Sequence, residues 1–138
     1  MAQTRLYLDT APIIYLVERV VTYVAVVEAR LSPVAGSDEA DELVLVISDL
    51  SRLECRVKPL RDGDADLLRD FDEFFAAIDQ IVPLSRAVVD EATRIRATYG
   101  FKTPDSLHLA AAILSNCGVF YTNDHRLDRF SELTIELL

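Results

Sequence analysis

The sequence has few of the residues on which several protein classes depend. It contains two cysteines, two histidines, four glycines and no tryptophan in 138 residues. Cys55 and Cys117 stand alone and share no metal-ligand spacing with His108 or His125, so we expect neither a zinc site nor a disulfide framework. Both cysteines are therefore predicted to be reduced residues of the core.

Long apolar runs are also missing. None reaches the ~20 residues needed to cross a bilayer, and residues 1–5 lead into a strand pattern instead of a signal sequence. We therefore expect a cytoplasmic protein without a membrane partner. No tract rich in Gly, Ser or Pro indicates a disordered tail. A length of 138 residues suits one core, so we predict a single domain over 1–138.

Positive charge is scarce, because the formal net charge is −9. This balance argues against a broad basic footprint for nucleic acid, and it suits a basic partner protein. Only two of the 14 basic residues, Lys58 and Lys102, are lysine. The remaining arginines occur in groups, and a guanidinium can bind phosphate with two hydrogen bonds at once. The alternative is that these groups are solvated faces.

What the chain does contain is an alternation of strand and helix patterns. Apolar runs of strand length occupy 6–8, 43–47, 81–82, 119–122 and 133–137. Helical spacing predicts a first helical region that is capped by Thr10 and breaks near Arg19, and a second helix over 49–56 before Pro59. A third helix is predicted to begin at Asp64 or Asp66. The last two are predicted from Ser85 to Gly100 and over 105–116 before Gly118. Residues 32–41 are predicted to be a loop. This alternation predicts an α/β fold with helices on both faces of a mainly parallel sheet of four to five strands.

The predicted strands and helices place four acidic residues at one edge of the sheet. Asp9 directly follows the first strand, which is where open α/β sheets bind ligands. Glu54 shares a helix face with Ser48 and Ser51, Asp105 begins a helix, and Asp124 follows a strand. Each acid alone has a structural explanation as a cap, a solvated residue or a turn residue. Together in one cleft they would bind divalent cations. His108 is instead expected to flank the core, and His125 to lie on the surface.

Four short segments carry a resemblance to a known family. Residues 6–15, Ser48-x-x-Ser51-x-x-Glu54, residues 105–112 and Thr122-Asn123-Asp124 resemble the four motifs of the PIN-domain nucleases, in order and spacing. The best match is to the VapC-like toxins of bacterial toxin–antitoxin pairs, over essentially the full length. The resemblance implies a Mg²⁺- or Mn²⁺-dependent endoribonuclease with a PIN-like three-layer α/β/α fold. It also implies a homodimer that a cognate antitoxin holds inactive.

The resemblance assigns residues to this site one by one. It implies a catalytic and metal-binding set of Asp9, Glu54, Asp105 and Asp124, with Thr10 and Thr122 as supporting polar residues and Asp128 as an outer acid. Ser48 is expected to support the site because it shares a helix face with Glu54. Arg52, Arg56 and Arg126, from the arginine groups, are expected to bind RNA phosphate. We expect Asp9 and Asp105 to bind metal directly or through water, Asp124 to serve a second position, and Glu54 to bind metal or orient water.

Two other classes of function could use similar residues. A phosphoryl-accepting receiver domain also uses strand-end acids with Mg²⁺, but it would need a late lysine and none follows Lys102. A catalytically silent module on the same fold, binding protein or RNA, is the second alternative, and the presence of all four acids argues against it.

Overall fold

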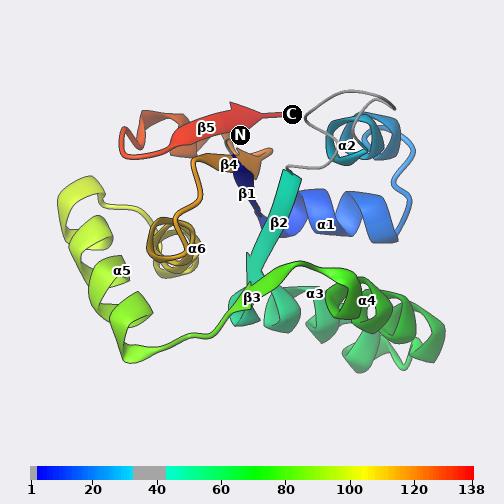
Figure 1. The fold of residues 1–138 in the computed structure, drawn as a ribbon. Coiled ribbons are helices and arrows are strands. Elements are labelled where there is room, and N and C mark those ends of the chain that lie inside the picture. Colours follow the sequence, from blue (N-terminus) through cyan, green and yellow to red (C-terminus); the bar gives the residue numbers. More distant parts are fainter. Residues whose placement is uncertain (1–2, 33–42) are drawn as a thin grey trace.

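Five parallel strands form the central sheet of the computed structural model, which describes residues 3–32 and 43–138 (Figure 1). The strand order is β3-β2-β1-β4-β5, and every neighbouring pair is parallel. The strands are β1 (Thr4–Leu8), β2 (Leu43–Ser48), β3 (Gln80–Val82), β4 (Val119–Thr122) and β5 (Thr134–Leu137). The predicted parallel α/β sheet is confirmed, with β1 in its centre. The predicted loop at 32–41 lies almost wholly outside the described residues.

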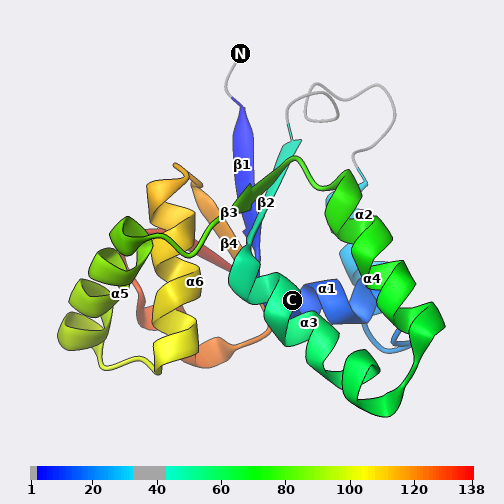
Figure 2. The same ribbon diagram turned by 90° about the horizontal axis from the view of Figure 1, so that it is seen from below.

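Helices cover both faces of the sheet, which gives three layers (Figures 1 and 2). One face carries α5 (Arg86–Tyr99) and α6 (Thr103–Leu114). The other carries α1 (Thr10–Val17), α2 (Val24–Leu31), α3 (Asp49–Asp62) and α4 (Ala65–Ala77). A short 3-10 helix, η2 (His125–Arg129), follows β4. In the described ranges, no helix has the length and apolar composition needed to cross a membrane.

The central strand packs against both helical layers. Tyr7 is fully buried in the cluster formed with α5 and α6, while Leu6 and Leu8 are fully buried in the cluster on the opposite face. This follows from the strand geometry, because successive side chains point to opposite faces. Continuous apolar runs in β1 and β2 are therefore the expected pattern of strands buried on both sides.

The first helical region begins and breaks close to its predicted positions, with one correction. Asp9, not Thr10, is the N-cap of α1, and its side chain accepts a hydrogen bond from the Thr10 N–H. The predicted break near Arg19 is confirmed, because that residue has φ of 52° and separates α1 from α2. A residue in the left-handed region interrupts the right-handed helix, and the valine-rich segment after it starts a new one.

Helix α3 corrects the predicted end at Arg56. It continues through the buried Pro59 to Asp62 and ends at Gly63, which adopts φ of 69°. A proline inside a helix removes one backbone hydrogen bond and costs about 3 kcal/mol. Cys55 and Pro59 lie one turn apart and are both buried. Packing of this face therefore offsets the lost hydrogen bond, which propensity alone does not reveal.

Helix α6 is shifted two residues toward the N-terminus relative to the predicted range. It begins at Thr103, with Pro104 in its first turn, and ends at Leu114. Proline is favoured in the first turn, where its missing N–H has no intrahelical acceptor. The left-handed residue after the helix is Asn116, with φ of 60°, instead of the predicted Gly118.

Candidate active site

Four acidic side chains converge on one cavity at the carboxyl ends of the central strands. Asp9 follows β1, Asp124 follows β4, Glu54 lies on α3, and Asp105 lies in the first turn of α6. All four line a cavity of about 430 Å³. The sequence interpretation that these four acids meet is therefore supported by their positions. Thr10, Thr122 and His108 line the same cavity.

Asp9 is held by two elements at once. Its Oδ1 accepts a hydrogen bond from the Thr10 N–H at 2.9 Å, and its Oδ2 accepts one from the Thr122 hydroxyl at 2.8 Å. The Thr122 oxygen in turn accepts a hydrogen bond from the Asp124 N–H at 2.9 Å. A cap and a strand-end threonine thus orient the first carboxylate and tie its position to the loop that carries Asp124.

Glu54 is held by one oxygen. Its Oε1 accepts a hydrogen bond from the Thr10 hydroxyl at 2.7 Å and lies 2.6 Å from Nε2 of His108. Burial acts to raise the pKa of Glu54, but the hydrogen bond and charge of His108, together with the Thr10 hydroxyl, lower it below its ordinary value. Glu54 is therefore a carboxylate at neutral pH.

Asp105 and Asp124 have opposite electrostatic surroundings. Burial, followed by the negative charges of Asp9 and Asp124, raises the pKa of Asp105 above its ordinary value. Hydrogen bonds from the Arg126 side chain lower the pKa of Asp124. The Arg126 guanidinium binds both Asp124 oxygens, at 2.9 and 2.6 Å. The carboxylates therefore repel one another across the cavity, and Arg126 neutralises one of them.

The cavity fits a hydrated hard cation better than a metal held by protein atoms alone. Within the described part of the chain, no group of three Asp, Glu, His or Cys side chains converges closely enough to hold a metal ion. Mg²⁺ usually keeps several waters and is bound through one or two carboxylates. The cavity is lined by carboxylate and hydroxyl oxygens, and a hydrated cation would relieve the repulsion between Asp9, Asp105 and Asp124.

The supporting residues divide into two sets. Thr10 and Thr122 line the cavity, as their predicted supporting role requires. Ser48 is fully buried behind it, where its hydroxyl is 2.9 Å from the Tyr7 hydroxyl and its N–H donates to Ser51 Oγ at 3.2 Å. Asp128 is exposed and does not line the cavity. Ser48 therefore supports the site through other residues, and Asp128 is separate from the cavity.

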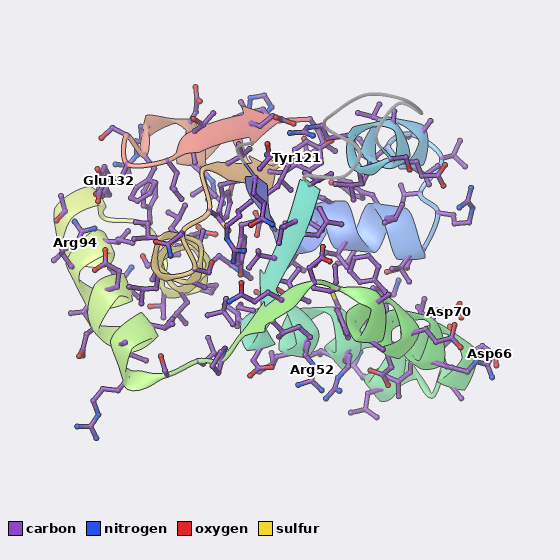
Figure 3. All side chains as sticks on the ribbon, in the orientation of Figure 1. Arg52, Asp66, Asp70, Arg94, Tyr121 and Glu132 are labelled. Carbon is purple, nitrogen blue, oxygen red and sulfur yellow. The ribbon has the colours of Figure 1, made fainter. Side chains whose placement is uncertain are left out.

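The three arginines predicted to contact RNA do not share one surface. Arg126 adjoins the acidic cavity through Asp124. Arg52 and Arg56 line a different cavity of about 450 Å³, together with apolar residues of α4 and β3. Figure 3 shows Arg52 beside α3. Both arginines are paired with acids, Arg52 with Asp49 at 3.2 Å and Arg56 with Asp72 at 3.6 Å.

Sequence reasoning missed two features of the cavity. His108 was expected to flank the core; it is buried, and it also contacts Glu54. Tyr15 and Asn123 line the cavity and are joined by a hydrogen bond of 2.9 Å from the Asn123 amide to the Tyr15 hydroxyl. The only sequence signal for His108 was its spacing, three residues after Asp105 on the same helix face. The two cysteines are free and buried, as expected.

The fold and the cavity together define an α/β protein with a polyacidic site at the carboxyl ends of a parallel sheet. A family model described as the PIN domain matches residues 6–133. The chain therefore belongs to the PIN-domain family. No curated protein sequence matches the chain significantly.

Solved structures with the same fold come from several bacteria. The chain is similar to VapBC2 from Rickettsia felis bound to a promoter DNA fragment, with 15% identity, TM-score 0.73, and 97% of this chain and 98% of that chain covered. It is similar to a toxin–antitoxin complex from Klebsiella pneumoniae, with 19% identity, TM-score 0.66, and 95% of each chain covered. VapBC-1 from nontypeable Haemophilus influenzae matches with 17% identity, TM-score 0.71, and 97% and 98% covered. At this identity the likeness shows the shared fold.

Proposed function

We propose that this protein is a Mg²⁺- or Mn²⁺-dependent endoribonuclease and acts as the toxin of a toxin–antitoxin pair. The observation that carries the proposal is the convergence of Asp9, Glu54, Asp105 and Asp124 on one cavity in a chain of the PIN-domain family. No nucleophilic serine or cysteine is needed for this chemistry. A cation bound there would activate water and stabilise the leaving oxygen of a phosphodiester.

Each carboxylate has a proposed task that follows from its surroundings. Asp9 and Asp105 hold the cation directly or through water, because their negative charges face one another across the cavity. Asp124 serves a second, weaker position, since both of its oxygens already accept hydrogen bonds from Arg126. Glu54 binds the cation or orients the attacking water.

The proposed substrate is RNA. Arg126 adjoins the acidic cavity and is the arginine best positioned to contact a phosphate next to the bond that is cut. Arg52 and Arg56 lie at a separate cavity, where they contact a more distant part of the strand. The net charge of −9 makes these arginines the localised sites on which an anionic substrate depends.

The proposed protein partner is an antitoxin, and the proposed assembly is a homodimer. The structural relatives include complexes described as VapBC and as a toxin–antitoxin pair. Val21, between α1 and α2, is 91% exposed, and Val26 on α2 is 51% exposed. An amphipathic antitoxin segment along this region would cover these side chains and bring a basic residue near the carboxylates. The cytoplasmic location stays a prediction.

The alternative is a catalytically silent module that binds protein or RNA. The observation in its favour is the double hydrogen bond from Arg126 to Asp124, which occupies a carboxylate that a nuclease would use. The two functions differ in one measurable respect. A binding module needs no divalent cation to act, whereas the nuclease does.

The test is cleavage of a structured RNA by the purified protein. Cleavage is expected with Mg²⁺ or Mn²⁺ and should disappear in excess EDTA. Asp105→Asn should be inactive, while Asp70→Asn, an exposed acid on α4, should cleave like wild type (Figure 3). Undiminished cleavage in EDTA, or an active Asp105→Asn, would contradict the proposal. Binding of RNA without cleavage under all these conditions would favour the silent module.

A further inference from the structure

A buried chain of polar side chains runs from the sheet to the acidic cavity. The Tyr7 hydroxyl of β1 lies 2.9 Å from Ser48 Oγ and 2.7 Å from Nδ1 of His108. Nε2 on the other side of the same ring lies 2.6 Å from Oε1 of Glu54. Four elements, β1, β2, α6 and α3, each contribute one residue. Tyr7 and Ser48 are fully buried, and the His108 side chain is 3% exposed.

The contacts of His108 indicate which ring nitrogen donates to Glu54. Oε1 of Glu54 accepts the Thr10 hydroxyl at 2.7 Å and lies 2.6 Å from Nε2 of His108, so Nε2 is the donor of a second hydrogen bond to this oxygen. The Tyr7 hydroxyl donates its single proton to Ser48 Oγ, and its oxygen can accept a hydrogen bond from Nδ1. Burial raises the pKa of Tyr7, which therefore keeps its proton.

Both ring nitrogens are thus engaged, and neither is free to bind a metal. The Thr10 hydroxyl, 3.3 Å from Nε2, shares the same Glu54 oxygen. The second Glu54 oxygen, Oε2, takes part in none of the hydrogen bonds found between the described residues. A hydrogen bond to an ionised group is stronger than a neutral one, and exclusion of water strengthens it further. The arrangement therefore fixes one oxygen of Glu54 and leaves the other for a ligand.

We propose that His108 is a positioning residue for Glu54: its Nε2–H holds the carboxylate at the cavity, while Tyr7 and Ser48 hold the imidazole ring. This inference rests on the proposed nuclease function for its effect on rate. The arrangement itself does not depend on that function. Loss of a residue that orients a ligand of a metal site lowers activity by about 10- to 100-fold.

Glutamine and asparagine separate positioning from packing. The amide nitrogen of glutamine reaches the place of Nε2, whereas that of asparagine reaches only the place of Nδ1. We expect kcat for RNA cleavage in Mg²⁺ to fall about 10- to 100-fold in His108→Asn and to be largely retained in His108→Gln, with KM unchanged in both. Tyr7→Phe removes the partner of Nδ1 and should give an intermediate loss. Tyr99→Phe, which removes a hydroxyl bonded to Ser131 and Glu132 outside the cavity, is the matched control.

Two measurements besides activity keep the inference open to disproof. Mn²⁺ binding, followed by electron paramagnetic resonance of the free ion, should be nearly unchanged in His108→Gln and weakened in Asp105→Asn. In metal-free protein, NMR should show a slowly exchanging Nε2 proton of His108 that shifts in Glu54→Gln. Equal activity of the Asn and Gln variants, loss of Mn²⁺ binding in His108→Gln, or absence of that proton would each overturn the proposal. Failure of wild type to cleave RNA would overturn the nuclease function, and the NMR result would still decide the hydrogen bond.

Discussion

Asp105 is the carboxylate whose charge is least compensated by its surroundings. Glu54 receives hydrogen bonds from Thr10 and His108, and Asp124 receives them from Arg126. Asp105 is instead partly buried near the negative charges of Asp9 and Asp124, and both effects raise its pKa. Residues of one chemical type are thus differentiated by their neighbours, and a cation in the cavity would relieve the least compensated of them.

Removing the charge of Asp105 should stabilise the metal-free protein. The pKa of Asp105 is higher in the folded state than in the unfolded state, so the ionised side chain lowers the free energy of unfolding at pH values above the folded-state pKa. This loss disappears below the ordinary carboxyl pKa of about 3.9, where the side chain is protonated in both states. Asp105→Asn should therefore unfold at a higher temperature than wild type at pH 7 in EDTA. The gain should be no more than about 1 kcal/mol, because the group is only half-buried and solvent screens its charge. Thermal melts from pH 7 downward should show the gain shrinking in acid.

The control for this measurement is Asp70→Asn, which removes an exposed charge from α4. It should change stability by no more than about 0.5 kcal/mol at any pH in the series. If Asp105→Asn melts below wild type at pH 7, the charge of Asp105 serves mainly to stabilise the start of α6. The site interpretation would then lose its electrostatic basis.

Arg126 is expected to compete with a cation for Asp124. Its guanidinium holds both carboxylate oxygens, at 2.9 and 2.6 Å. Arg126→Ala should bring the pKa of Asp124 back toward its ordinary value and tighten Mn²⁺ binding by up to about fivefold, the size expected of an exposed ion pair. The KM for RNA should rise at the same time, because a phosphate contact is lost. Titration with Mn²⁺ and steady-state cleavage measure the two effects.

Arg69→Ala is a matched control for the arginine variant, since Arg69 pairs with Asp66 on α4 at 3.1 Å. Neither Mn²⁺ binding nor KM should change there. Unchanged Mn²⁺ affinity in Arg126→Ala would show that Asp124 does not belong to the metal position.

At the scale of elements, the starts of helices α1 and α3 determine the positions of Asp9 and Glu54 in the cavity. The N-terminus of α1 is fixed by Asp9 itself, so the cap and the proposed ligand are one residue. Helix α3 starts directly after β2 and carries Glu54 toward the cavity before it passes through Pro59 to Gly63. The backbone is therefore regular through the segment that presents Glu54, and the irregular positions come after it.

Gly63 should be needed for the end of α3. Its φ of 69° lies in the left-handed region, where a side chain costs about 1–2 kcal/mol, although no atom lies within 4 Å of an added Cβ. Gly63→Ala should lower the free energy of unfolding in urea by this amount. Gly118→Ala, with equal space and no positive φ, should be close to neutral. Equal effects of the two changes would show that the conformation of Gly63 carries no strain for alanine.

At the scale of the whole molecule, helices cover both faces of the sheet, and the acidic cavity lies at the carboxyl ends of its central strands. Large apolar side chains nevertheless remain exposed around the helical face that carries α1, α2 and α3, namely Val21, Val26, Leu53, Val57 and Leu60. We propose that the antitoxin covers Val21 and Val26, on the same side of the sheet as the exposed side chains of α3.

Val21→Asp should weaken binding of the antitoxin without unfolding the protein. Val21 is 91% exposed, so the change should alter stability by no more than about 0.5 kcal/mol. The partner to use is the product of the neighbouring reading frame, and co-purification followed by titration measures the loss. Val89→Asp, on α5 across the sheet and 49% exposed, is the control that should bind normally. Full binding by Val21→Asp would move the docking site elsewhere.

Much of the fold was determined by the sequence alone, because its signals are local. The apolar runs that became β1 and β2 are buried on both faces, and such runs predict central strands without knowledge of their neighbours. The caps Asp64 and Ser85 and the stop at Gly100 act within one helical turn. The four acids were predicted from equally local signals, since each follows a strand, begins a helix or lies on a helix face.

Tertiary structure alone decided the features that depend on distant residues. The contact between His108 and Glu54 joins positions 54 residues apart, and that between Tyr7 and His108 joins positions 101 apart. Burial kept α3 helical through Pro59 against its local propensity. The pKa directions at Glu54 and Asp105 follow from partners that no spacing rule specifies. Local propensity places an element along the chain, but only packing determines which side chains meet and what charge each one carries.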